Sequence, residues 1–453
     1  MLFLPYAHVL DLCGLASIPR ACSGTVHPRR RPPGRLSAQF FHFLDVSALS
    51  AACSPYVGLS PFLRLSIAGE PLQPVAEHLL SVAADEPDNP NVWMNLSLAA
   101  QCLGQPETGA AMRDQALALA RCYALPALRQ PASCRLLLLM AEGDIAENTP
   151  IDCLLEQSDV DLVHFYPRDG HLNFADLPEH DILMVAMADS PASRPLLAGL
   201  AGALADWPRP VINRPEHVPA TERTEASRRL QEVPGIRMPP TRLVGRDALS
   251  RIAAGQSAPV MEFPDVGFPF IVRPRGSQAG RDLARVESAP ELAGYLSAVD
   301  ALEFFISDYV DYRGADGLFR KMRIALIDGE PFVCHMAVSG HWMVHYVNAG
   351  MYEDAGRRAE EAAFMARFDA FAERHRAALA ALCQRIPLDY FCIDCAELPD
   401  GRLMIFEVDH VMVVHAMDPE ALFPYKQQSM QRVEEAFRAA LLRRLGRSSA
   451  EAQ

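Results

Sequence analysis

Asp400-Gly401 lies between two apolar segments near the C-terminus, and this pair constrains the fold more than any other feature of the sequence. An Asp-Gly pair in such a position is a strong signal for a tight β-hairpin. We therefore expect residues 388–398 and 402–408 to pair as antiparallel strands. The rest of the chain must then supply strands and helices that cover the apolar faces of this hairpin.

Three carboxylates are expected to converge on the hairpin. Side chains alternate between the two faces of a strand, so Leu403, Ile405, Glu407 and Asp409 should share one face, with Asp394 beside them on the partner strand. Converging carboxylates repel one another unless a cation lies between them, and hard oxygen ligands suit Mg²⁺ better than zinc. Two interpretations stay open on these residues alone, namely a magnesium site and a solvated acidic hairpin without a ligand.

The other predicted strands follow two patterns. Between residues 131 and 240, continuously apolar strands alternate with helical segments, which is typical of a parallel α/β sheet; these strands are 135–140, 160–166, 181–186 and 210–215. Beyond residue 240, runs of strands with separate helices indicate an α+β domain with a largely antiparallel sheet. Its predicted strands before the hairpin are 268–273, 303–310, 319–327, 331–338 and 341–347, and its predicted helices are 288–299, 357–385 and 426–445.

The N-terminal part of the chain has a different character. Residues 1–60 contain a Pro/Arg-rich run and are predicted to be a poorly ordered extension, although a nucleic-acid-binding arm is the other interpretation. Residues 61–130 are expected to form a helical segment, because about 71–125 has the periodicity of three helices, and 89–119 resembles one tetratricopeptide unit. A single unit is too short for a solenoid, so we expect a small helical cap that offers a surface to a protein partner.

Charge and hydropathy exclude several classes of function. The 453-residue chain has a formal net charge of −14, which argues against a general nucleic-acid binder. No long segment is free of charges and helix breakers as a membrane span would be. The 11 cysteines are scattered, as in proteins of a reducing compartment. We therefore expect a cytoplasmic protein with neither a membrane nor a nucleic acid as its partner.

A second candidate site follows the strand predicted at 268–273. This apolar strand ends at Arg273, and the chain then enters a loop of small residues that contains Gly276, Ser277 and Gly280. Glycine allows backbone amides to approach phosphate oxygens closely, and the arginine could bind the same oxygens. An ordinary turn with a surface arginine is the alternative.

Taken together and in this order, these segments resemble the ATP-grasp superfamily. The family pattern is an apolar strand that ends in Lys-Pro, a glycine-rich loop, a hinge strand, a strand with Asp and a strand with Glu-x-Asn. The corresponding segments here are 271–274, 276–280, 306–311, 393–394 and 407–409. The resemblance covers about residues 131–445. It implies a pre-ATP-grasp α/β domain over 131–240 and an ATP-grasp domain of two α+β lobes over 241–453, preceded by the short all-helical segment.

The resemblance also implies a site for ATP and Mg²⁺. Arg273 matches the phosphate-binding lysine, and the backbone of Tyr309 and Val310 would bind adenine. The full set carried over for the nucleotide is Arg223, Arg273, Gly276, Ser277, Gly280, Asp308, Tyr309, Val310 and Asp311, with Asp316 as the other candidate for the ribose. Asp394, Glu407 and Asp409 match the magnesium ligands. Two residues depart from the family pattern, because arginine replaces lysine at 273 and aspartate replaces asparagine at 409.

Residues 319–348 are expected to form the substrate side of the site. By resemblance, Arg323 lies near the transferred phosphate, and Lys321, one of only two lysines in the chain, is a second candidate catalytic cation. Four further residues are candidates for substrate binding: Arg320, His341, His345 and Asn348. His341 and His345 would share one face of the strand predicted at 341–347. For Arg320 and Lys321, a solvated strand edge is the alternative.

The function implied by the resemblance is an ATP- and Mg²⁺-dependent carboxylate–amine ligase. ATP would phosphorylate a carboxylate, and an amine would then attack the acyl-phosphate, so the substrates are a small molecule or peptide that bears a carboxylate and a second molecule that bears an amine. Two alternatives stay open: an inactive ATP-binding regulatory protein and a phosphotransferase of the same fold.

Overall fold

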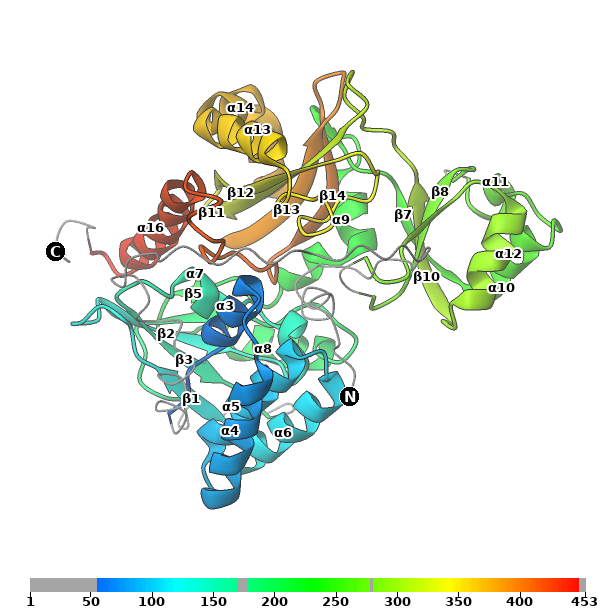
Figure 1. Cartoon of the computed structure of the whole chain (residues 1–453). Helices are drawn as coiled ribbons and strands as arrows, with labels where there is room; N and C mark the ends of the chain where they lie inside the picture. The colour runs from blue at the N-terminus through cyan, green and yellow to red at the C-terminus, as the bar shows by residue number, and fades with distance from the viewer. Residues whose placement is uncertain (1–54, 169–176, 265, 278–279, 448–453) are drawn as a thin grey trace, which may run out of the picture.

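The computed structural model describes residues 55–168, 177–264, 266–277 and 280–447. Figure 1 shows the N-terminal helices against one side of an α/β sheet, a large sheet above that sheet, and a small lobe beside the large sheet. Residues 1–54, most of the predicted extension, lie outside the described residues. In the part of the chain that is described, no helix is long and apolar enough to span a bilayer.

Four helices form the N-terminal segment: α3 (Ser60–Ala68), α4 (Gln73–Asp85), α5 (Pro90–Cys102) and α6 (Pro106–Leu119). Each has proline in its first turn, where the missing N–H has no helical partner to lose. The predicted boundaries shift in two places. Tyr56 and Leu59 are already buried, and β1 (Cys122–Leu125) leaves the helical segment to pair with the following sheet.

The second unit contains the parallel α/β sheet that the sequence predicted. Its strand order is β1-β3-β2-β4-β5, in which β2 (Cys134–Leu139), β3 (Val160–Phe165), β4 (Ile182–Val185) and β5 (Val211–Ile212) run parallel, while β1 is antiparallel to β3. The connections carry η1 (Ile145–Glu147), α7 (Ile151–Leu154), α8 (Arg194–Ala203), η3 (Val218–Thr221) and α9 (Arg223–Leu230). Buried Leu, Val and Met side chains on both faces of β2 and β4 explain why these strands are continuously apolar.

A small antiparallel lobe follows. Its order is β7-β10-β8-β9, built from β7 (Thr241–Gly245), β8 (Phe270–Pro274), β9 (Ala284–Val286) and β10 (Glu303–Asp308). The lobe also contains α10 (Arg246–Ala253), α11 (Pro259–Glu262) and α12 (Ala289–Ala298). Even-numbered residues of β8 and β10, such as Phe270, Val272 and Phe304, pack in the core of this lobe. The odd-numbered residues therefore face the opposite side.

The large sheet has the order β12-β11-β13-β14-β6, in which β11 (Phe319–Ile327), β12 (Glu330–Ser339), β13 (Tyr390–Glu397) and β14 (Leu403–Asp409) are antiparallel and β6 (Ile236–Arg237) is parallel to β14. The predicted Asp-Gly hairpin is thus confirmed as β13–β14. Helices α13 (Ala355–Ala366), α14 (Phe368–Arg374) and α15 (Arg376–Arg385) cover one face, while α16 (Lys426–Arg444) packs at one end of the other (Figure 1). The mixed α/β and α+β class predicted from the sequence is confirmed.

One predicted strand is wrong. Residues 341–347 form a loop, because Ser339-Gly340 ends β12 and the chain then folds back on itself. The side chain of Asn348 accepts a hydrogen bond from the backbone N–H of His345 at 2.9 Å, so this polar residue stabilises a turn where the pattern predicted pairing.

Candidate functional site

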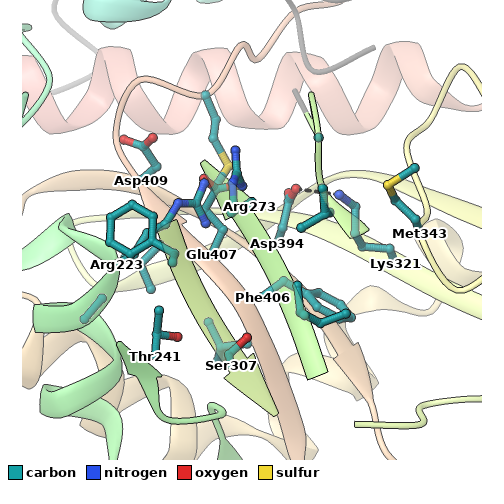
Figure 2. Close-up of a pocket in the computed structure, with 18 of the residues that line it drawn as sticks. Arg223, Thr241, Arg273, Ser307, Lys321, Met343, Asp394, Phe406, Glu407 and Asp409 are labelled. Atoms are coloured by element: carbon teal, nitrogen blue, oxygen red, sulfur yellow. Dashed lines mark hydrogen bonds and ion pairs between the residues drawn. The ribbon is translucent and has the colours of Figure 1, made fainter. Parts of the chain in front are cut away.

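A cavity of about 250 Å³ lies between the small lobe and the free face of the large sheet. The small lobe contributes the odd-numbered residues Ile271, Arg273, Phe305 and Ser307, and the large sheet contributes β11, β13 and β14. In Figure 2 the charged side chains form a row across the cavity, with Thr241, Ser307 and Phe406 on one side of that row. The cavity therefore has a charged region and a separate, largely uncharged region.

A β-bulge at Phe406 decides which residues of β14 face the cavity. Asp394 is opposite Glu407, but the next residue of β13, Cys395, is opposite Ile405, so Phe406 is an extra residue in its strand. The bulge reverses the alternation of faces. Glu407 and Asp409 do share a face with each other, whereas Leu403 and Ile405 pack in the core cluster beneath the sheet, contrary to the prediction of one common face. Ile405 also borders the cavity.

Asp394 is paired with two cations. Its carboxylate accepts from Lys321 Nζ at 2.9 Å and from Arg323 Nε at 2.9 Å and Nη2 at 3.2 Å, and the residue is only 2% exposed. Burial alone would raise the pKa of Asp394, but Arg323 and Lys321 hold it well below its usual value. The carboxylates therefore do not converge as a bare acidic cluster, because cations from the neighbouring strand lie among them.

Arg223, at the start of α9, forms an ion pair with Glu407. Arg273 lies beside this pair, 9% exposed, and burial together with the nearby charge of Arg223 lowers its pKa to about 9. Arginine stays protonated at such a value, so Arg273 is charged at neutral pH. Burial would raise the pKa of Glu407, but Arg223 and Arg273 lower it overall. Two guanidinium charges thus act on one carboxylate, Arg223 through an ion pair and Arg273 through its nearby charge, which leaves an excess of positive charge for a further anion.

Asp409 lies at the far end of the row, and within the described residues no lysine or arginine forms an ion pair with it. Its contact is His410, with Nδ1 at 3.8 Å, and burial lowers the pKa of His410 to about 4. Burial and the neighbouring charge of Glu407 raise its pKa to about 7, and its Oδ1 accepts from the backbone N–H of Val411 at 3.1 Å. A cation bound between Asp409 and Glu407 would relieve this repulsion, so these two oxygen donors fit Mg²⁺. Across the described residues, no group of three or more His, Cys, Asp or Glu side chains has the arrangement of a preformed metal site. Both oxygens of Asp394, in particular, are engaged by cations.

The predicted glycine-rich loop approaches the cavity from above Arg273. Arg273 donates to Ser277 through Nε (3.1 Å to Oγ) and Nη2 (to the backbone oxygen), so the arginine fixes the start of the loop. Gly276 and Gly280 have φ of 75° and 72°, values that favour glycine. A Cβ on Gly280 would lie 2.5 Å from Nε2 of His345, which also requires glycine there. Residues 278–279 of the predicted loop lie outside the described residues.

The predicted adenine-binding segment lies at the uncharged region. Asp308, Tyr309 and Val310 line the cavity. The guanidinium carbon of Arg285 is 4.1 Å from the centre of the Tyr309 ring, which makes a cation–π contact. Asp311 lies just outside, where it is bound to Arg313, and it does not line the cavity.

The structure separates the predicted substrate residues. Lys321, Arg323 and His345 line the cavity, whereas Arg320, His341 and Asn348 do not. Arg320 points to the opposite face of β11, where it pairs with Asp316 and Glu360, because neighbouring residues of a strand face opposite ways. His345 is half-buried, and its buried Nε2 has no hydrogen-bond partner among the described residues. Burial and then the charge of Lys321 lower the pKa of His345 to about 3, so its imidazole is neutral at pH 7.

Several residues that line the cavity carry no signal in the sequence. Thr241 and Met404 belong to its uncharged region, and a separate apolar group consists of Leu59, Ile145, Met412 and Val413. These side chains come from segments far apart in the chain. Because they are ordinary apolar residues without a motif, only their meeting in the folded chain identifies them.

Comparison with known proteins finds likeness at the level of solved structures. No family model and no curated sequence matches. Similar structures include D-alanine–D-alanine ligase from Bacillus anthracis complexed with ATP (14% identity, 67% of this chain and 99% of that chain, TM-score 0.39) and D-alanyl-alanine synthetase A from Vibrio cholerae (12% identity, 69% and 98%, TM-score 0.42). A third is a RimK domain protein described as ATP-grasp from Sphaerobacter thermophilus (17% identity, 68% and 98%, TM-score 0.38). At such identities and TM-scores these neighbours carry no argument about the family or the activity of this chain.

Proposed function

We propose that this protein is an ATP-dependent ligase that activates a carboxylate as an acyl-phosphate for attack by an amine. The observation that supports this most strongly is the row of four cations, Arg223, Arg273, Lys321 and Arg323, which alternates with carboxylates in a cavity between two antiparallel sheets. Preorganised cations in a site of low water content are what phosphoryl and acyl transfer require, because both reactions move negative charge.

The two regions of the cavity suit the two parts of ATP. The uncharged region beside Tyr309 and Val310 offers Ile271, Met404 and Phe406 to a purine ring. The triphosphate then extends toward Arg273 and Arg223, which have capacity for an anion beyond Glu407. Glu407 and Asp409 would hold Mg²⁺, whose chemistry is to neutralise the phosphate oxygens during transfer.

The reaction takes place at the Lys321–Arg323 end of the row. A carboxylate oxygen of the substrate attacks the γ-phosphorus of ATP, the bond between that phosphorus and the β,γ-bridging oxygen breaks, and ADP leaves. The amine nitrogen then attacks the acyl carbon, the carbon–oxygen bond to phosphate breaks, inorganic phosphate leaves, and the amine proton passes to solvent. Arg323 and Lys321 orient the carboxylate and stabilise the negative charge that develops on the acyl-phosphate.

His345 orients the amine in this proposal. A neutral imidazole with an unpaired, buried Nε2 can accept a hydrogen bond from an incoming N–H. It does not store the proton, because burial and Lys321 disfavour the imidazolium. Its contact with Gly280 places it where the glycine-rich loop meets the substrate end of the cavity.

One observation favours the second candidate, a nucleotide-binding protein without turnover. Asp394, the residue carried over as a magnesium ligand, has both oxygens engaged by Lys321 and Arg323. A site whose carboxylate stays locked in these ion pairs could bind a nucleotide and yet lack the metal arrangement for transfer.

ADP release in the presence of hydroxylamine tests the proposal. Hydroxylamine traps an acyl-phosphate as a hydroxamate, so Mg²⁺–ATP with a panel of carboxylates should give ADP and hydroxamate in equal amounts. Arg323→Met should abolish both products, while Arg320→Met, a cation on the same strand that faces away from the cavity, should keep them. Nucleotide binding without ADP from any carboxylate supports the regulatory candidate, and ADP with a phosphorylated product that resists hydroxylamine supports a phosphotransferase.

A further inference from the structure

One wall of the cavity includes a residue from outside the region that resembles ATP-grasp proteins. Leu59, which directly precedes α3, lines the cavity and is 6% exposed. It packs in one apolar cluster with Met412, and Ile145 of η1 packs against this cluster. We call Leu59, Ile145, Met412 and Val413 the apolar wall.

The N-terminal helices hold the apolar wall in place. The Leu59 and Ser60 backbone N–H groups donate to the buried carboxylate of Asp152 at 2.6 and 3.2 Å. Gly58, with φ of 75°, lies so close to the same carboxylate that a Cβ there would be 2.7 Å from it. Just upstream, Asn95 of α5 accepts from the Val57 N–H at 3.1 Å. The Leu59 backbone therefore has one defined position.

The same helix holds the second part of the apolar wall. Gln101 of α5 accepts from the backbone N–H of Ile145 at 2.9 Å, and Arg113 of α6 donates to the carbonyl of Gly143 at 2.5 Å. Gln101 is itself buried and donates to Ser97 at 3.1 Å. Helix α5 thus anchors Ile145 directly and, through Val57, the segment that leads into Leu59, although Leu59 and Ile145 are 86 positions apart in the chain. The helical segment is part of the construction of the cavity.

The apolar wall adjoins the catalytic cations. The carbonyl of Val413 accepts from Arg323 Nη1 at 3.1 Å, so the apolar wall begins where the proposed carboxylate would be activated. None of its four side chains is charged or has a hydrogen-bond donor, and the thioether of Met412 is at most a weak acceptor. An apolar surface beside a cationic site selects a molecule that has a carboxylate at one end and an uncharged, apolar group next to that carboxylate. A polar group placed against the apolar wall would lose its bound water without gaining a hydrogen bond in return.

We propose that the substrate activated here is a carboxylic acid whose aliphatic side group packs against the apolar wall, and that Leu59 sets the size of that group. This inference rests on the proposed ligase function. It assigns the N-terminal helical segment the role of determining substrate size, through residues that lie outside the region of family resemblance.

A chain-length series of acids tests the inference. The hydroxamate assay is run with Mg²⁺–ATP, hydroxylamine and straight-chain monocarboxylates of increasing length, with dicarboxylates and hydroxy acids as polar counterparts. The wild type should prefer the monocarboxylates over polar acids of equal length. Leu59→Ala should move the optimum to a longer chain, and Leu59→Phe to a shorter one, with the ratio of kcat/KM between neighbouring lengths changing about tenfold, as one methylene group in an apolar pocket can cause.

Leu63→Ala is the matched control, since Leu63 is a buried leucine of α3 that does not line the cavity. It should lower the melting temperature as Leu59→Ala does, but leave the length optimum unchanged. The inference is overturned if polar acids are preferred, or if the optimum is the same in all Leu59 variants. A second readout separates this result from failure of the ligase function, namely the thermal shift that each acid causes with a non-hydrolysable ATP analogue and Mg²⁺. If the thermal shifts depend on acid length and change in the Leu59 variants but no ADP forms, the ligase function alone is refuted. If neither length-dependent thermal shifts nor hydroxamate appear, both the ligase function and the inference about the substrate are refuted.

Discussion

Replacing Arg273 by methionine should separate ligand affinity from fold stability. Arg273 is a cation in a nearly dry environment next to Arg223, and its pKa falls from the ordinary 12.5 to about 9. A depressed pKa of a base means that the folded state binds the proton less tightly than the unfolded chain does. At every pH below about 9, the charge of Arg273 therefore costs folding free energy, about 5 kcal/mol for a shift of about 3.5 units at 1.36 kcal/mol each.

Part of this cost is offset in the native protein by the two hydrogen bonds from Arg273 to Ser277. Hydrogen bonds from charged donors are worth about 1.5–3 kcal/mol each, so together they roughly cancel the cost of the buried charge. Methionine keeps most of the aliphatic volume and removes both contributions. We therefore expect the unfolding free energy of the nucleotide-free Arg273→Met protein to stay within about 2 kcal/mol of the wild type.

ATP affinity should respond very differently. Loss of one charge-assisted contact of about 1.5–3 kcal/mol weakens binding about 10- to 150-fold. Urea unfolding without nucleotide gives the stability, and isothermal titration with a non-hydrolysable ATP analogue and Mg²⁺ gives the affinity. Arg275→Met is the control, because Arg275 pairs with Glu303 at the surface and should change neither quantity. Unaltered affinity in a folded Arg273→Met protein, or a large loss of nucleotide-free stability, would refute the reasoning.

Three further results are expected. Glu407→Gln should abolish turnover and also lower the nucleotide-free unfolding free energy by about 1–3 kcal/mol, because it leaves two guanidinium groups without their anion. A variant that is more stable than the wild type in urea unfolding would contradict this. Burial alone would raise the pKa of Asp418, but Lys426 outweighs burial and lowers this pKa to about 2, below the unfolded value of 3.8. The ion pair therefore stabilises the fold above about pH 4, and this contribution is lost as the pH falls toward 2. Unfolding of Asp418→Asn should accordingly show a deficit of about 2–3 kcal/mol at pH 6 that shrinks below pH 4, and a deficit independent of pH would exclude this pair as its cause. Removal of residues 1–60 should lower the melting temperature, because it takes away buried Tyr56, whereas removal of residues 1–54 tests whether the predicted extension is dispensable.

Local patterns in the sequence determined the elements of the large sheet and the order of the units. Strand β11 was predicted over the residues it occupies, and the Asp400-Gly401 turn identified the hairpin. Both signals depend on neighbours in the chain, since alternation and turn conformation are properties of a few consecutive residues. The same alternation correctly placed Glu407 and Asp409 on one face. It wrongly placed Leu403 and Ile405 on that face too.

The tertiary structure alone decided which side chains face the cavity and which of them form ion pairs. The bulge at Phe406 reverses the faces of β14 because the partner strand sets the register, and no local pattern at 403–409 shows it. Two of the three carboxylates that the sequence suggested would repel one another, Asp394 and Glu407, are matched by cations. Lys321 and Arg323 reach Asp394 from the neighbouring strand, and Arg223 reaches Glu407 from a helix. Ion pairs and packing depend on distance in space.

The same physical reason explains the apolar wall. Leu59 and Ile145 have no motif, and their side chains are ordinary core residues until the fold brings them beside Arg323. Their position depends on hydrogen bonds from a helix that the sequence predicted correctly as a helix but could not place. Periodicity identifies which face of a helix is apolar, but which other segment that face meets is a property of the folded chain as a whole.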